Sequence, residues 1–229
     1  GADVGRSDTN ARICVTLAAG PGAAERLTAA LGAVEVATAV VRPAAGSATL
    51  DSASALPLVT LAQARGVAVL IEADARLART LKADGVHLPW SPDVVAAYAE
   101  AREILGKRGI VGAEAGCSRH AAMELGEAGA DYVAFRRFPD SGRHPDAATD
   151  DGGGAEPAIE LPCDQLSLIA WWADIFEVPV LGLDAGTQAE AEALIEAGAD
   201  FVAFELKPGA AVGDIAALLQ APIAGRGSK

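Results

Sequence analysis

Three acidic residues stand where short apolar runs of the sequence end. Glu72 follows "VAVLI", Glu114 follows "GIVGA" and Asp184 follows "VPVLGL". Carboxylate oxygens are the ligands that Mg²⁺ prefers, usually one or two of them together with substrate phosphates, so these acids, with Asp74 beside the first, could hold a magnesium ion. No spacing fixes them around one point, and the simpler interpretation is separate carboxylates, each solvated or paired with an arginine.

Arginines also follow apolar runs. A planar guanidinium binds phosphate or carboxylate groups through parallel hydrogen bonds, so Arg42, Arg136 and Arg137 could form an anion site. Adjacent residues of a strand point to opposite faces, so only one of the last two can face such a site. Trp90 could stack on a planar ligand or simply fill the pocket. Arginines that only form salt bridges are an equally good interpretation.

The composition limits the classes of partner. The 229 residues include 18 basic and 31 acidic side chains, and the formal net charge is -13. This balance argues against nucleic acid and anionic membrane surfaces as partners, since both need a basic surface. Cys14, Cys117 and Cys163 have no metal-type spacing, and their odd number argues against a disulfide framework, so we expect buried thiols. A cytoplasmic protein that binds a small molecule is the expectation.

Apolar runs and helix-like stretches alternate along the chain. The runs are nearly continuous in hydrophobicity, which is typical of parallel strands covered on both faces. About eight runs and eight helical stretches predict a single (β/α)8 barrel, a TIM barrel, over residues 11–229. An open doubly wound sheet, which normally uses fewer units, is the alternative. Residues 1–10 are expected to form a flexible tail, and the Gly-, Pro- and Asp-rich segment 139–162 a mobile loop.

Three similar sequence motifs occur where a helical stretch leads into an apolar run. They are "KADGVHL" (82–88), "EAGADYVAF" (127–135) and "EAGADFVAF" (196–204). Glycine suits the left-handed end of a helix, and the following Asp opens the turn into the next strand. The repetition indicates a recurring βα unit. Ser91, Ser118 and Thr187 precede helical stretches and are predicted N-caps.

These motifs resemble the corresponding segments of the thiamine phosphate synthase and TenI family. The resemblance extends over "ADGVHL", "GIVGAEAGCSRHAAMELGEAGADYVAF" and "VPVLGLDAGTQAEAEALIEAGADFVAF". It implies a barrel that joins a pyrimidine diphosphate to a thiazole phosphate, with Mg²⁺ holding the diphosphate that leaves. It also implies a phosphate-binding turn after the seventh strand, where Gly186 keeps the turn tight.

The family's catalytic positions hold other residues in this chain. Ala73 aligns with the metal-binding Asp, Glu114 with a fifth-strand Ser, and Asp184 with a Gly of the phosphate turn. The resemblance therefore implies a divergent member with weak or no synthase activity, which would use Mg²⁺ only if active. The alternative is a non-catalytic or regulatory paralogue that binds a phosphorylated or planar small molecule. Trp171 and Trp172 are expected to pack within the chain, although an exposed ring could serve a homodimer interface.

Overall fold

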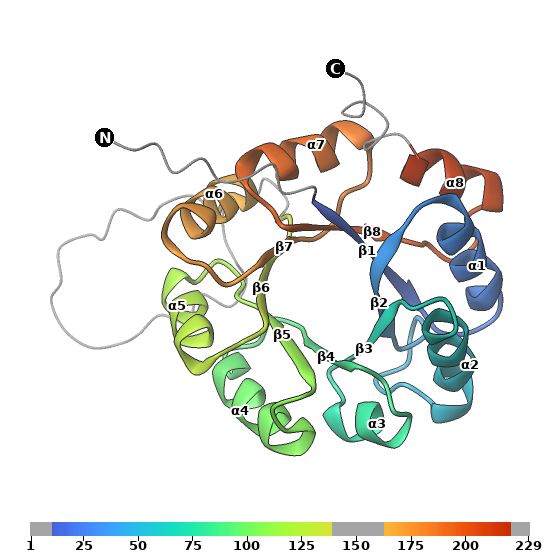
Figure 1. Cartoon of the computed structure of the whole chain (residues 1–229), viewed down its shortest axis with the longest axis horizontal. Helices are drawn as coiled ribbons and strands as arrows, with labels where there is room; N and C mark the ends of the chain where they lie inside the picture. The colour runs from blue at the N-terminus through green and yellow to red at the C-terminus, as the bar shows by residue number, and fades with distance from the viewer. Residues whose placement is uncertain (1–10, 139–162, 221–229) are drawn as a thin grey trace, which may run out of the picture.

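Eight parallel strands form a closed barrel in chain order, and the last strand pairs with the first (Figure 1). The structure, a computed structural model, describes residues 11–138 and 163–220. The expected tail (1–10) and the expected loop (139–162) lie outside these ranges. The strands are β1 (Arg12–Ala18), β2 (Val36–Arg42), β3 (Ala68–Glu72), β4 (Gly85–Leu88), β5 (Ile110–Glu114), β6 (Tyr132–Phe135), β7 (Val180–Gly182) and β8 (Phe201–Glu205).

Helices follow the strands and surround the barrel (Figure 1). They are α1 (Ala23–Ala33), α2 (Ser52–Gln63), α3 (Ala75–Thr80), α4 (Val94–Leu105), α5 (Arg119–Ala128), α6 (Gln165–Ile175), α7 (Gln188–Ala197) and α8 (Val212–Gln220). The alternation of strands and helices confirms the (β/α)8 barrel that the sequence predicts. No helix in the described part of the chain is long and apolar enough to cross a membrane.

The Asp that recurs in the three similar motifs makes the same pair of hydrogen bonds each time. In each motif the backbone N–H of the Asp donates, at 2.8–2.9 Å, to the carbonyl of a valine at the first or second position of the preceding strand. The pairs are Asp84 with Val69, Asp131 with Val111, and Asp200 with Val180. The carboxylate of the same Asp accepts the N–H of that valine at 2.7–2.9 Å. Each Asp therefore closes a two-bond ring between one strand and the start of the next. We call these three residues the aspartate clamps; they join β3 to β4, β5 to β6 and β7 to β8.

The barrel interior is a small cluster, separate from the main core. Its buried side chains come from alternate strand positions and include Cys14, Leu70, Tyr132 and Leu181. Gly112 of β5 pairs in register with Tyr132 of β6, and a Cβ at this glycine would overlap the tyrosine ring. The missing side chain on β5 therefore makes the room that the Tyr132 ring fills.

Two predictions about local structure need correction. Cys117 and Cys163 form a disulfide with their Cα atoms 5.4 Å apart; the odd cysteine count hid this pair, because Cys14 alone is the buried free thiol. Ser118 and Thr187 are N-caps as predicted. Ser91 is not, because helix α4 begins three residues later, at Val94, and has Asp93 at its N-cap position.

Candidate functional site

Arg136 connects two carboxylates at the end of the barrel where the strands terminate. It directly follows β6, and its Nε donates to Oε1 of Glu114 at 2.8 Å while its Nη1 donates to Oδ1 of Asp184 at 2.9 Å. Glu114 is the last residue of β5 and its side chain is only 2% exposed. One guanidinium therefore neutralises a buried acid and holds the β7–α7 turn, where Asp184 has a left-handed backbone with φ 63°.

A buried hydrogen-bond chain continues from Glu114 into the barrel. Nε2 of His87 lies 3.0 Å from Oε2 of Glu114, and Nδ1 lies 2.6 Å from the hydroxyl of Tyr132. A carboxylate can only accept, so the Nε2–H of His87 donates to it. The histidine thus joins a buried network that connects β4, β5 and β6.

The network changes the acidity of its members. Burial alone would raise the pKa of Glu114, but hydrogen bonds and charges from His87 and Arg136 outweigh it and lower that pKa to about 2. Burial raises the pKa of Glu72, and the neighbouring His87 and Arg42 side chains oppose the rise only in part. One acid at the mouth is therefore held ionised while a second is less acidic than usual.

Arg137 forms a separate contact with the first turn of α7. Its Nη1 donates to Oε1 of Glu190 at 2.7 Å, and its backbone N–H donates to Oδ2 of Asp184 at 3.2 Å. The other oxygen of Glu190 accepts the N–H of Gly186 at 2.7 Å, and Thr187 accepts the N–H of Glu190 at 3.2 Å. The guanidinium groups of Arg136 and Arg137 thus bind different glutamates, Glu114 and Glu190, although both residues contact Asp184.

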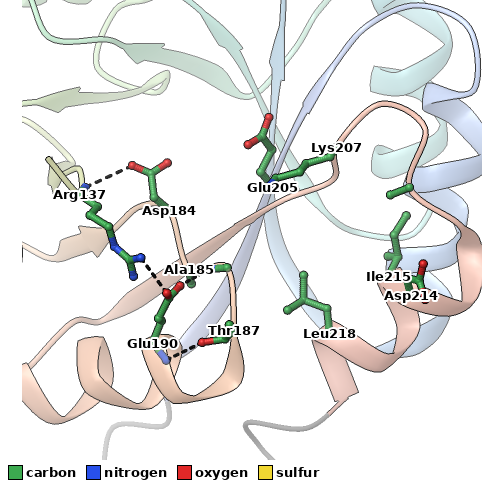
Figure 2. A pocket seen from close by; sticks show the side chains of 12 residues that line it. Arg137, Asp184, Ala185, Thr187, Glu190, Glu205, Lys207, Asp214, Ile215 and Leu218 are labelled. Atoms are coloured by element: carbon green, nitrogen blue, oxygen red, sulfur yellow. Dashed lines mark hydrogen bonds and ion pairs between the residues drawn. The ribbon is translucent and has the colours of Figure 1, made fainter. Parts of the chain in front are cut away.

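A cavity of about 600 Å³ opens beside this contact, between the β7–α7 turn and the segment that joins β8 to α8. Figure 2 shows Arg137 and Glu190 on one side and Lys207 and Leu218 on the other. Glu205, the last residue of β8, also lines it and accepts from Nη2 of Arg42 at 2.7 Å. The cavity is a mixed site, with charged groups on its walls and apolar side chains at one end.

The remaining predicted site residues lie elsewhere. Trp90 packs against the core and over Gly116 of the β5–α5 turn, where a Cβ would come within 2.6 Å of the indole; this position agrees with a ring that fills space. Asp74 is the N-cap of α3, and its Oδ1 accepts the N–H of Leu77 at 2.8 Å. Glu72 ends β3 and is half-buried at the mouth.

The predicted metal ligands do not form a set. Among residues 11–138 and 163–220, no group of three or more His, Cys, Asp or Glu side chains is placed to hold a metal ion. Glu114 and Asp184 already share the Arg136 guanidinium, and Asp74 caps a helix. The expectation that Glu72 and Asp74 coordinate one ion stays a prediction.

Comparison with known proteins agrees with this architecture. The profile of the family described as "Thiamine monophosphate synthase" matches residues 14–205, which is most of the chain. The chain belongs to the thiamine monophosphate synthase family. The match begins within β1 and ends with β8, so it includes the β7–α7 turn but not the segment between β8 and α8 that forms the other side of the cavity.

Curated relatives have the corresponding name. The "Thiamine-phosphate synthase" of Erythrobacter litoralis is 42% identical over 147 residues, which cover 64% of this chain and 62% of the relative. The protein of the same name from Rhodospirillum centenum is 38% identical over 183 residues, or 79% of each chain. The chain therefore spans less than two thirds of the Erythrobacter relative and more of the Rhodospirillum one.

Solved structures show the same fold at low sequence identity. "Thiamine phosphate pyrophosphorylase" from Pyrococcus furiosus superimposes with a TM-score of 0.67 and 16% identity, covering 93% of this chain and 94% of that one. A tryptophan synthase structure from M. tuberculosis superimposes almost equally well, with a TM-score of 0.65 and 15% identity. At these identities the likeness shows the barrel and says nothing about the chemistry.

Sequence reasoning found some members of the mouth and missed others. It named Arg42, Arg136 and Arg137, but not Glu190, which pairs with Arg137, or Glu205, which pairs with Arg42. A signal for the first acid was present: "TQAE" has the Ser/Thr-x-x-Glu spacing of a capping box. Glu205 had no local signal, because its partner is 163 residues away in the sequence.

Proposed function

We propose that this family member binds a phosphorylated small molecule at the mouth of its barrel and forms little or no thiamine phosphate. The observation that carries the proposal is the position of Arg136 between Glu114 and Asp184. A side-chain cation already neutralises the two carboxylates that a relocated magnesium site at the mouth would use. The relatives' printed names support the family's ligands, while the altered residues argue against the family's turnover.

The residues present do not fit a magnesium ion. Mg²⁺ requires oxygen ligands in near-octahedral geometry, commonly from one or two carboxylates together with phosphate oxygens. Ala73, at the position that the family resemblance gives to the metal-binding Asp, has no oxygen in its side chain. Bringing a dication close to Arg136 would also add repulsion between like charges. No reaction step in this proposal therefore passes through a metal.

The mouth retains groups that can bind an anion. Nε of Arg42 is buried and has no hydrogen-bond partner among the described residues, although Nη2 of the same side chain contacts Glu205. Lys207 lines the cavity and, within the described ranges, forms no ion pair. Arginine and lysine side chains both bind phosphate groups, but these two do not replace the charge stabilisation that a departing diphosphate needs.

A coupling assay tests the proposal. The chain is mixed with the pyrimidine diphosphate, the thiazole phosphate and Mg²⁺, and thiamine phosphate is quantified; the Rhodospirillum centenum relative serves as the positive control. We expect turnover at least about a thousandfold below the usual range of roughly 1–10³ per second, because transition-state charge stabilisation is the largest catalytic contribution in most enzymes. Turnover within that range would show that the chain is a true synthase.

A further inference from the structure

Both oxygens of the Glu190 carboxylate accept hydrogen bonds from groups that typically bind anions. One oxygen accepts from the Arg137 guanidinium and the other from the Gly186 backbone N–H, each at 2.7 Å (Figure 2). A guanidinium and a backbone N–H ahead of a helix are the donors with which proteins bind phosphate. The side chain therefore occupies the position that an anionic ligand would take at the β7–α7 turn.

The local sequence fixes this arrangement. Thr187 is the N-cap of α7 and accepts the N–H of Glu190, which places the acid in the first helical turn. From there its side chain reaches back past the N-cap and accepts the N–H of Gly186, the residue before Thr187. The arrangement is similar to a capping box. The hydrogen bond from Arg137, the bond from Gly186 and the charge of the arginine lower the pKa of Glu190 despite slight burial. The carboxylate is therefore an ionised part of the helix start at neutral pH.

The cavity offers a second cation and open space beside the carboxylate. Lys207 lies on the β8 side of the roughly 600 Å³ space and, among the described residues, pairs with no acid. Ile215 and Leu218 provide apolar surface at the α8 end, where Asp214 also lines the cavity (Figure 2). A ligand with one anionic group and a small apolar body fits these walls, provided that its anion reaches the donors that Glu190 now occupies.

We infer that Glu190 is a specificity-determining residue, whose carboxylate fills the anion position of the β7–α7 turn so that a phosphate group enters only by displacing it. The inference rests on the proposed function, since it concerns the same cavity. Two anions at one pair of donors repel each other at short range. The native chain is thus expected to bind phosphate monoesters weakly, and to bind them well once Glu190 has lost its charge.

Calorimetry with inorganic phosphate and phenyl phosphate tests the inference on the full chain. We compare the native protein with Glu190→Gln and with the control Glu192→Gln, which removes the same charge from an exposed position on the same helix. Glu190→Gln should bind both ligands about tenfold or more tightly than the native chain, because hydrogen bonds to charged groups are the strong ones. Glu192→Gln should bind like the native chain.

Glu190→Asp provides a second measurement if the glutamine variant does not fold. It keeps the charge but shortens the side chain by one methylene, so it cannot reach Arg137 and Gly186 as well, and phosphate binding should again improve. The inference is overturned if neither variant binds phosphate more tightly than the native chain, or if Glu192→Gln gives the same gain as Glu190→Gln.

The outcomes separate the inference from the proposed function. If the native chain binds phenyl phosphate tightly and Glu190→Gln binds it no better, the inference fails and the proposed function stands. If Glu190→Gln binds phosphate but the native chain binds none of the ligands, the inference stands and the proposed function fails for the native protein. Ordinary synthase turnover in the coupling assay contradicts the proposed function alone.

Discussion

Replacing Arg136 by Met should destabilise the fold far more than the same change at its neighbour Arg137. Arg136 contacts Glu114, whose side chain is 2% exposed, and its removal leaves that carboxylate buried with only His87 beside it. Arg137 contacts Glu190 where the two side chains are 47% and 31% exposed. The two adjacent arginines therefore offer a matched comparison between a buried ion pair and an exposed one.

The expected loss follows from the acidity of Glu114. Its pKa falls from 4.5 to about 2, and because one pKa unit equals about 1.4 kcal/mol, the charged state is favoured by about 3 kcal/mol in the folded protein. His87 accounts for the larger part of this lowering and Arg136 for the rest, so the figure for Arg136 rests on the cost of removing one partner of a buried ion pair, about 3–5 kcal/mol. We therefore expect Arg136→Met to lower the free energy of unfolding by about 3 kcal/mol, and Arg137→Met by at most about 1 kcal/mol.

Urea denaturation at pH 7 measures both changes. The double variant Arg136→Met, Glu114→Gln should recover part of the loss, because the unpaired charge has gone. The reasoning is refuted if Arg136→Met unfolds within about 1 kcal/mol of the native chain, since that is the range of exposed pairs. A loss of about 3 kcal/mol in Arg137→Met as well would show that burial does not distinguish the two contacts.

The pH dependence of this effect has a definite sign. The pKa of Glu114 is lower in the folded chain than its ordinary value of 4.5. The pair therefore contributes its full stability above pH 4.5, and the contribution is lost as the pH falls from 4.5 towards 2. The difference in stability between the native chain and Arg136→Met should shrink over that window, and urea titrations at pH 7 and pH 3.5 measure it.

Three further changes test the fold. Gly112→Ala should destabilise by about 1–3 kcal/mol, because its Cβ would overlap the Tyr132 ring; a melting temperature equal to the native one would contradict this. Cys163→Ser opens a covalent loop with a sequence separation of 46 and should cost up to about 4 kcal/mol under oxidising conditions, with no difference from the native chain in excess dithiol. Asp131→Asn should cost about 1–3 kcal/mol in urea unfolding, whereas an unchanged midpoint would show that its clamp does not stabilise.

The barrel was predictable because its signals are local. Strands that are covered on both faces are apolar throughout, so eight such runs are visible in a single sequence. The sequence motifs around Asp84, Asp131 and Asp200 also repeat, because each Asp makes the same two hydrogen bonds. The fold class and two of three predicted N-caps follow from information within a few residues.

The pairing of the mouth residues was not predictable in the same way. Arg136 and Asp184 are 48 residues apart, and Arg42 and Glu205 are 163 apart. Barrel closure brings them together, and no periodicity of the sequence specifies which acid meets which arginine. The sequence therefore left ion pair and anion site as equal interpretations, and the structure shows that each of the predicted arginines contacts a carboxylate.

The aspartate clamps divide the barrel into strand–helix–strand modules that follow one another in the sequence. Asp84, Asp131 and Asp200 each join two strands that are consecutive in the sequence, so these contacts can form before the ring is complete. The barrel then behaves as tandem strand–helix–strand modules, β3 to β4, β5 to β6 and β7 to β8, with α4 and α6 as the links between modules. A circularly permuted chain opened at one of these links should keep all three modules, whereas an opening within a module would separate an Asp from its valine.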